Sequence, residues 1–95
     1  MNTNKIAQKI ADKTNVDMVT AETMATQLGK VHPDLKGVID AWLNGQEIQF
    51  EFGGVSLERI MRRNKCNYLH AIFNMSSILN EPELAKAYLR PQVRQ

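Results

Sequence analysis

Cys66 and His70 are the one pair of side chains whose types and spacing suit a nucleophile beside a base. If Cys66 stands just before a helix, the helix dipole and the histidine could lower the pKa of its thiol. A free cysteine is, however, more often a small buried side chain. The sequence also lacks the HExxH, GxSxG, GxxxxGK[ST] and GxGxxG motifs. We therefore predict that the protein is not an enzyme and has no catalytic residues.

Metal binding has equally little support in the sequence. The candidate ligands are Cys66, His70 and His32, and His32 is distant from the other two. A closed zinc site needs four cysteine or histidine ligands in paired spacings. We expect His32 instead to cap a helix that begins at Pro33, and we predict neither a metal site nor a cofactor.

Residues 56–79 resemble a helix-turn-helix, because two stretches of helical periodicity are joined by a short turn. Basic side chains on the first stretch could contact phosphates, and a polar stripe on the second could contact base edges. The candidate partner-binding or nucleic-acid-binding residues are Arg59, Arg62, Arg63, Lys65, Asn67, His70 and Asn74. The resemblance implies a DNA-binding transcriptional regulator.

Three positions depart from the motif. Met61 stands where the first helix usually has a small residue, and Lys65 stands where the turn usually has glycine. Ile72 and Phe73 occupy positions that should be polar and face the DNA groove. DNA binding therefore remains the alternative, and the same segment also fits an ordinary helical hairpin with a solvated basic face.

Our leading interpretation is a small non-enzymatic protein-interaction module, a regulator, adaptor or inhibitor that occupies a partner's surface. Four internal methionines (Met18, Met24, Met61, Met75) could adapt to an irregular partner, although they also suit a small core. An exposed strand edge could pair with a strand of a partner. A homodimer would pair that edge and double the basic surface, but nothing in the sequence requires it.

Composition and charge are consistent with a folded domain. Of the 95 residues, 43% are hydrophobic and 23% are charged, which argues against intrinsic disorder. Residues 1–55 contain five basic and seven acidic side chains, whereas residues 56–95 contain seven basic and three acidic ones. This asymmetry suggests that a partner meets the basic half. The lone cysteine and the lack of a long apolar run predict a cytoplasmic protein without a membrane segment.

Helical periodicity accounts for most of the chain. Apolar residues recur at helical spacing over about residues 4–14, 18–28, 33–44, 57–64, 68–79 and 82–89. Asp17, Ser56 and Asn67 are suited to cap helices, and Pro33 is suited to the first turn of one. We expect Trp42 at the centre of the core.

The period changes to two over residues 47–52, where Ile48, Phe50 and Phe52 alternate with polar residues as in a half-buried strand. Gly53-Gly54 could close a hairpin with Val55 and Leu57, or form a loop before a helix capped by Ser56, which we favour. The sequence thus predicts a mostly α fold of five to six short helices with one short strand or hairpin near residues 47–57. We expect a single domain over residues 1–90 and a flexible tail over 91–95.

Overall fold

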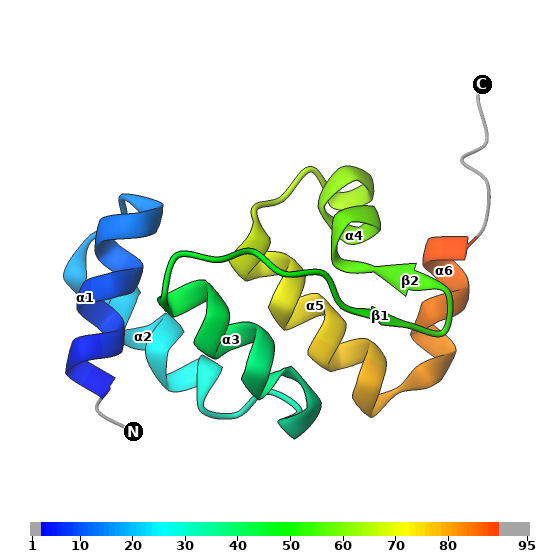
Figure 1. Cartoon of the computed structure of the whole chain (residues 1–95), viewed down its shortest axis with the longest axis horizontal. Coiled ribbons are helices and arrows are strands. Elements are labelled where there is room, and N and C mark those ends of the chain that lie inside the picture. The colour runs from blue at the N-terminus through cyan, green and yellow to red at the C-terminus, as the bar shows by residue number, and fades with distance from the viewer. Residues whose placement is uncertain (1–2, 90–95) are drawn as a thin grey trace. The chain divides into compact units, whose positions relative to one another are not determined.

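The computed structural model describes residues 3–89, which form a mostly α-helical fold with one small hairpin (Figure 1). The helices and strands are α1 (Thr3–Thr14), α2 (Met18–Leu28), η1 (Pro33–Leu35), α3 (Lys36–Leu43), β1 (Glu51–Phe52), β2 (Val55–Ser56), α4 (Leu57–Asn64), α5 (Tyr68–Asn80), η2 (Pro82–Leu84) and α6 (Ala85–Leu89). The predicted fold class is confirmed. No helix in the described part is long and apolar enough to cross a membrane.

The chain divides into two compact units, one ending at Gln46 and the other beginning at Glu47. The prediction of a single domain over 1–90 stays a prediction, and the predicted tail at 91–95 lies outside the described residues. Each unit has its own buried apolar side chains.

In the first unit, α1 packs against α2 and α3. Trp42 is 4% exposed, as expected of a core residue, and the Lys13 ammonium lies 5.4 Å from the centre of its ring. The Lys9 ammonium donates to the Leu43 carbonyl at the end of α3. The side chains of this core are Ile6, Ala7, Ile10, Ala21, Ala25, Leu28, Leu35, Val38, Ile39 and Trp42.

The predicted helix caps of the first unit are present. The Asp17 carboxylate accepts from the Thr20 amide at 2.8 Å, and hydrogen bonds from Thr20 lower the pKa of Asp17. His32 Nδ1 accepts from the Asp34 amide at 3.1 Å. Pro33 opens a 3-10 turn before α3 instead of one continuous helix. Of the four internal methionines, which also suited a small core, Met18 is 36% exposed in the first turn of α2.

The hairpin begins the second unit. β1 pairs antiparallel with β2 through Gly53 and Gly54, whose φ angles of 60° and 84° suit a two-residue turn that needs positive φ at both positions. Ser56 ends β2 and also caps α4, accepting from the Arg59 amide at 3.0 Å. The structure therefore combines the hairpin of one alternative with the Ser56 cap of the other, and Leu57 begins α4 instead of lying on the second strand. The paired strand is shorter than residues 47–52, and Ile48 is 42% exposed.

The helix α5 supplies most of the core of the second unit and packs against α4. Its buried residues are Tyr68, Leu69, Ala71, Ile72, Met75, Ser76 and Ile78. Tyr68 reaches the segment before the hairpin, where its hydroxyl donates to the Ile48 carbonyl. Burial raises the pKa of Tyr68 to about 12, with a smaller contribution from the negative charge of Glu47.

Candidate functional site

Two hydrogen bonds to Tyr88 attach the short helix α6 to α4. The Arg59 guanidinium donates from Nε to the Tyr88 carbonyl at 2.7 Å, and the Asn64 amide donates to the Tyr88 hydroxyl at 2.9 Å. The chain reaches α6 through the turn η2, which begins at Pro82. A proline at this position ends α5 and turns the chain back, because it cannot donate the next helical hydrogen bond. These contacts leave a groove between α4, α5 and the η2–α6 segment.

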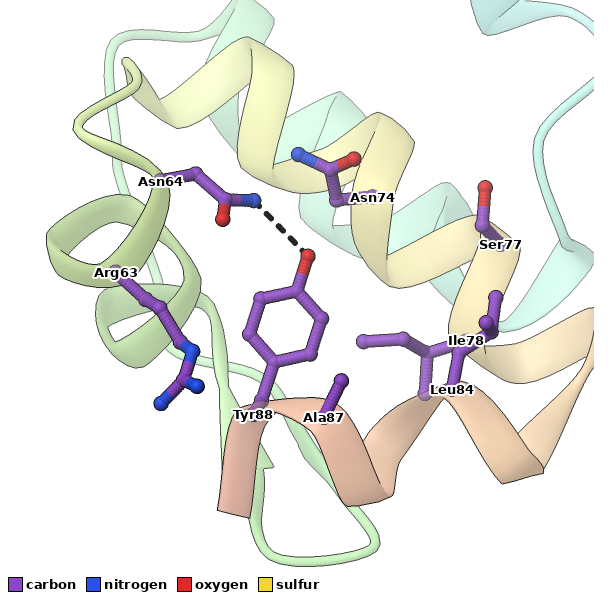
Figure 2. A pocket seen from close by; sticks show the side chains of 8 residues that line it. All are labelled: Arg63, Asn64, Asn74, Ser77, Ile78, Leu84, Ala87 and Tyr88. Carbon is purple, nitrogen blue, oxygen red and sulfur yellow. Dashed lines mark hydrogen bonds between the residues drawn. The ribbon is translucent and has the colours of Figure 1, made fainter. Parts of the chain in front are cut away.

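This groove, hereafter the α4–α5–α6 groove, has a volume of about 470 Å³ (Figure 2). It is lined by Arg63, Asn64, Asn74, Ser77, Ile78, Leu84, Ala87 and Tyr88. Ile78, Leu84, Ala87 and the Tyr88 ring give an apolar surface. Leu84 is 40% exposed, so the apolar surface is open to solvent.

The rim of the groove is polar. Figure 2 shows that Arg63 and Asn64 belong to α4, and Asn74 and Ser77 to α5, with the Arg63 guanidinium pointing away from Asn74. Arg63 is the single charged residue among the described residues that line the groove, and no carboxylate is among them. The rim can therefore donate hydrogen bonds to a ligand and present a positive charge at the α4 end.

The structure divides the seven predicted site residues into separate groups. Arg63 and Asn74 line the α4–α5–α6 groove. Arg59 is half-buried and holds α6 in place. Arg62 and Lys65 are exposed at the end of α4, where Arg62 lies 3.9 Å from Glu58.

The last two of the predicted residues, Asn67 and His70, bond to each other at the start of α5. Asn67 Oδ1 accepts from the His70 amide at 2.9 Å and lies 2.7 Å from His70 Nδ1. The His70 ring also meets the Phe73 ring edge-on at 6.5 Å. The Asn67 side chain thus caps the helix, and the His70 side chain contacts that cap.

Lys65 has φ 52° and ψ 47°, the left-handed conformation that glycine takes in many helix-ending turns. The departure from the helix-turn-helix pattern at this position is thus one of residue type and not of backbone shape. Such turns end roughly a third to a half of all helices, so the conformation by itself does not indicate DNA binding. Ile72 is fully buried and faces the core, as its apolar side chain requires.

The structure offers no support for a reactive Cys66. Its thiol lies 3.9 Å from the Ile60 carbonyl, and partial burial raises its pKa, which disfavours the thiolate. In residues 3–89, no group of three or more histidine, cysteine, aspartate or glutamate side chains could hold a metal ion.

Sequence analysis missed most of the groove. Leu84 and Tyr88 lie in the stretch of helical apolar periodicity predicted over about residues 82–89, and in the structure they form one wall of the groove. Asn64 and Ser77 belong to no motif that would have identified them in the sequence. The available signal was Tyr88 itself, because a tyrosine on a short amphipathic helix tends to place its hydroxyl at a polar partner near the surface.

A smaller groove of about 280 Å³ lies in the first unit and contains His32 and Lys36. None of the seven predicted site residues lines it. Comparison with protein-family models, with curated proteins and with solved structures gives no match, so the α4–α5–α6 groove is the basis for the functional proposal.

Proposed function

We propose that the chain is a cytoplasmic, non-enzymatic protein-interaction module, a regulator, adaptor or inhibitor, and that a partner protein binds in the α4–α5–α6 groove. The observation that carries the proposal is an apolar surface, including the exposed Leu84, bordered by hydrogen-bond donors. Protein interfaces commonly have this arrangement of an apolar centre and a polar rim.

The openness of the groove favours a protein partner over a small substrate. A small-molecule site usually encloses most of its ligand. Here Leu84 and Ser77 are exposed, and Asn74 and Tyr88 are half-buried. A side chain from a partner could enter the groove while the partner's backbone covers the rim.

The decisive experiment uses Ser77→Trp, which fills the groove from an exposed position on α5. Asn80→Trp is the matched control, because Asn80 is exposed on the same helix and does not line the groove. The parent and both variants would be used to capture proteins from the native host. We expect one protein in stoichiometric amount with the parent and with Asn80→Trp, and its loss with Ser77→Trp.

Equal capture by all three proteins would rule out the groove as the contact. Size-exclusion chromatography with light scattering on the purified chain adds a second outcome. A homodimer that Ser77→Trp dissociates would make the partner a second copy of the chain.

The second candidate function is DNA binding, which the exposed Arg62 and Lys65 beside the turn favour. A labelled duplex of mixed sequence would be titrated at about 50 and about 200 mM salt. Phosphate binding would weaken by orders of magnitude over this range, and Arg62→Ala would flatten that dependence. No binding at the lower salt concentration would leave the protein partner as the remaining proposal.

A further inference from the structure

We infer that the α4–α5–α6 groove recognises an acidic segment of the partner protein. A branched apolar side chain of that segment would pack against the exposed Leu84, next to the buried Ile78, and a neighbouring glutamate or aspartate would lie beside Arg63. This inference rests on the proposed function and specifies the chemistry of the partner.

The apolar half of the groove sets the size of the inserted side chain. Ile78 is 1% exposed and fixed in the core of the unit, whereas Leu84 is 40% exposed on the facing segment. An apolar side chain between them would remove the exposed face of Leu84 from water, which is favourable in proportion to the area covered. Ala87 has only a methyl group, which leaves room beside the Tyr88 ring.

The polar half of the groove sets the sign of the ligand's charge. Arg63 is cationic, and the amides of Asn64 and Asn74 and the hydroxyl of Ser77 add donors without adding negative charge. The Asn64 amide donates to Tyr88. Arg63 carries the positive charge of the lining, so it is the group that attracts a ligand anion. A guanidinium binds a carboxylate with charge-assisted hydrogen bonds, which are stronger than neutral ones.

The charged residues at the two ends of the groove determine the orientation in which an acidic ligand binds. At the α4 end, Arg62 and Lys65 are exposed beside Arg63, and the acidic residue of α4, Glu58, lies within 3.9 Å of Arg62. At the opposite end, Glu81 and Glu83 are exposed on the segment that carries Leu84. Glu83 pairs with Lys86 at 3.2 Å. The carboxylate of the partner is therefore expected at the α4 end.

The test uses short acetylated and amidated peptides in a background of serine and alanine. Each carries one leucine and one glutamate, in either order and two or four positions apart, since these spacings place both on one side of an extended or a helical peptide. Matched peptides have glutamine in place of glutamate. Binding is followed by the amide shifts of the ¹⁵N-labelled protein, with Arg63→Gln as the variant and Arg62→Gln as its neighbouring control.

We expect at least one glutamate peptide to shift the amides of Asn74, Ser77 and Tyr88. It should bind about three- to tenfold more tightly than the matched glutamine peptide. The ion pair with Arg63 strengthens binding, and its partial exposure to solvent keeps the preference modest. Arg63→Gln should remove that difference, and Arg62→Gln should retain it.

Equal binding of the glutamate and glutamine peptides to the parent would overturn the inference, and this comparison does not depend on any variant folding. An equal loss of the preference for glutamate peptides in Arg63→Gln and Arg62→Gln would overturn the inference too. It would indicate a general attraction of acidic peptides to the basic helix. If Ser77→Trp abolishes partner capture while no glutamate peptide is preferred, this inference fails and the proposed function stands. If Ser77→Trp has no effect on capture, the proposed function fails independently.

Discussion

Lys65 holds the left-handed backbone conformation that ends α4, and a side chain with a Cβ is strained there. We predict that Lys65→Gly stabilises the protein by about 0.5–1 kcal/mol, because glycine adopts this conformation without steric penalty. Urea unfolding followed by circular dichroism would measure the change.

Asn15, at φ 57°, provides the comparison for Lys65. Asparagine tolerates the left-handed region better than lysine does, so Asn15→Gly should gain less than Lys65→Gly. Equal gains in stability at both positions would contradict the argument that lysine is more strained than asparagine in this conformation.

Tyr68 links folding to alkaline pH. Its pKa is about 12 in the folded protein, against an ordinary value of 10.0. Because the folded pKa is the higher one, this contribution to stability is complete below pH 10 and is lost as pH rises toward 12. We predict that Tyr68→Phe, which removes the bond to the Ile48 carbonyl, destabilises by about 1 kcal/mol at pH 8.

The measurement is urea unfolding of the parent and Tyr68→Phe at several pH values between 8 and 11. The stability gap between them should narrow above pH 10, since the phenylalanine variant lacks this titration. A gap that stays constant through pH 11 would contradict the assignment.

At the scale of the elements, the hairpin turn and α6 constrain each other. A Cβ added at Gly54, where φ is 84°, would lie 3.2 Å from Leu89 Cδ2 of α6. A Cβ at Gly53 would meet Ala85 at an ordinary 3.5 Å. The two glycines of one turn therefore differ in the space around them.

We predict that Gly54→Ala destabilises the protein by about 1–2 kcal/mol, through the unfavourable φ and the approach to Leu89. Gly53→Asn should be close to neutral, because asparagine is favoured at the first position of such a turn. Thermal unfolding of the two variants would separate these effects. A similar loss of stability in both would mean that the turn tolerates no side chain at either position.

Helix positions could be predicted because their signals are local. The caps at Asp17, Ser56 and Asn67 act within three residues, and the apolar stripes follow from the helical period. The alternation over residues 47–52 predicted a strand. Alternation describes side chains, however, and does not tell how far the backbone is paired. Strand pairing covers residues 51–52, and one further hydrogen bond runs from the Leu57 amide to the Phe50 carbonyl at 3.0 Å.

The groove could not be predicted because it depends on how η2 and α6 return onto α4. Arg63 and Asn74 were selected for a possible DNA contact, and they line the groove for a reason that involves Tyr88 and Leu84, ten or more residues away. An amphipathic pattern places Leu84 and Tyr88 on the inner side of a helix. It does not tell whether the space in front of them is filled.

At the scale of the whole chain, the open question is whether the two units unfold together. Each has fewer than about 50 residues and on its own would bury a smaller fraction of its unfolded surface than a larger domain does. We therefore expect one cooperative transition, in keeping with the prediction of a single domain. The two histidines of the sequence suit the test, since His32 lies in the first unit and His70 in the second.

Proton NMR of the two imidazole rings during urea titration would follow each unit separately, and Trp42 fluorescence would add an independent probe of the first. Coincident midpoints are the expected result. Midpoints that differ between His32 and His70 would show that the chain comprises two domains.

The attachment of α6 through Tyr88 has a thermodynamic consequence for binding. A helix of five residues is too short to persist without its tertiary contacts, so the groove exists only in the fraction of molecules in which α6 is docked. If a partner binds in the groove as proposed, its apparent affinity scales with that fraction. By linkage, a bound partner must slow hydrogen exchange in α6, and loosening the remote Arg59 contact must weaken binding without altering any atom that touches the ligand.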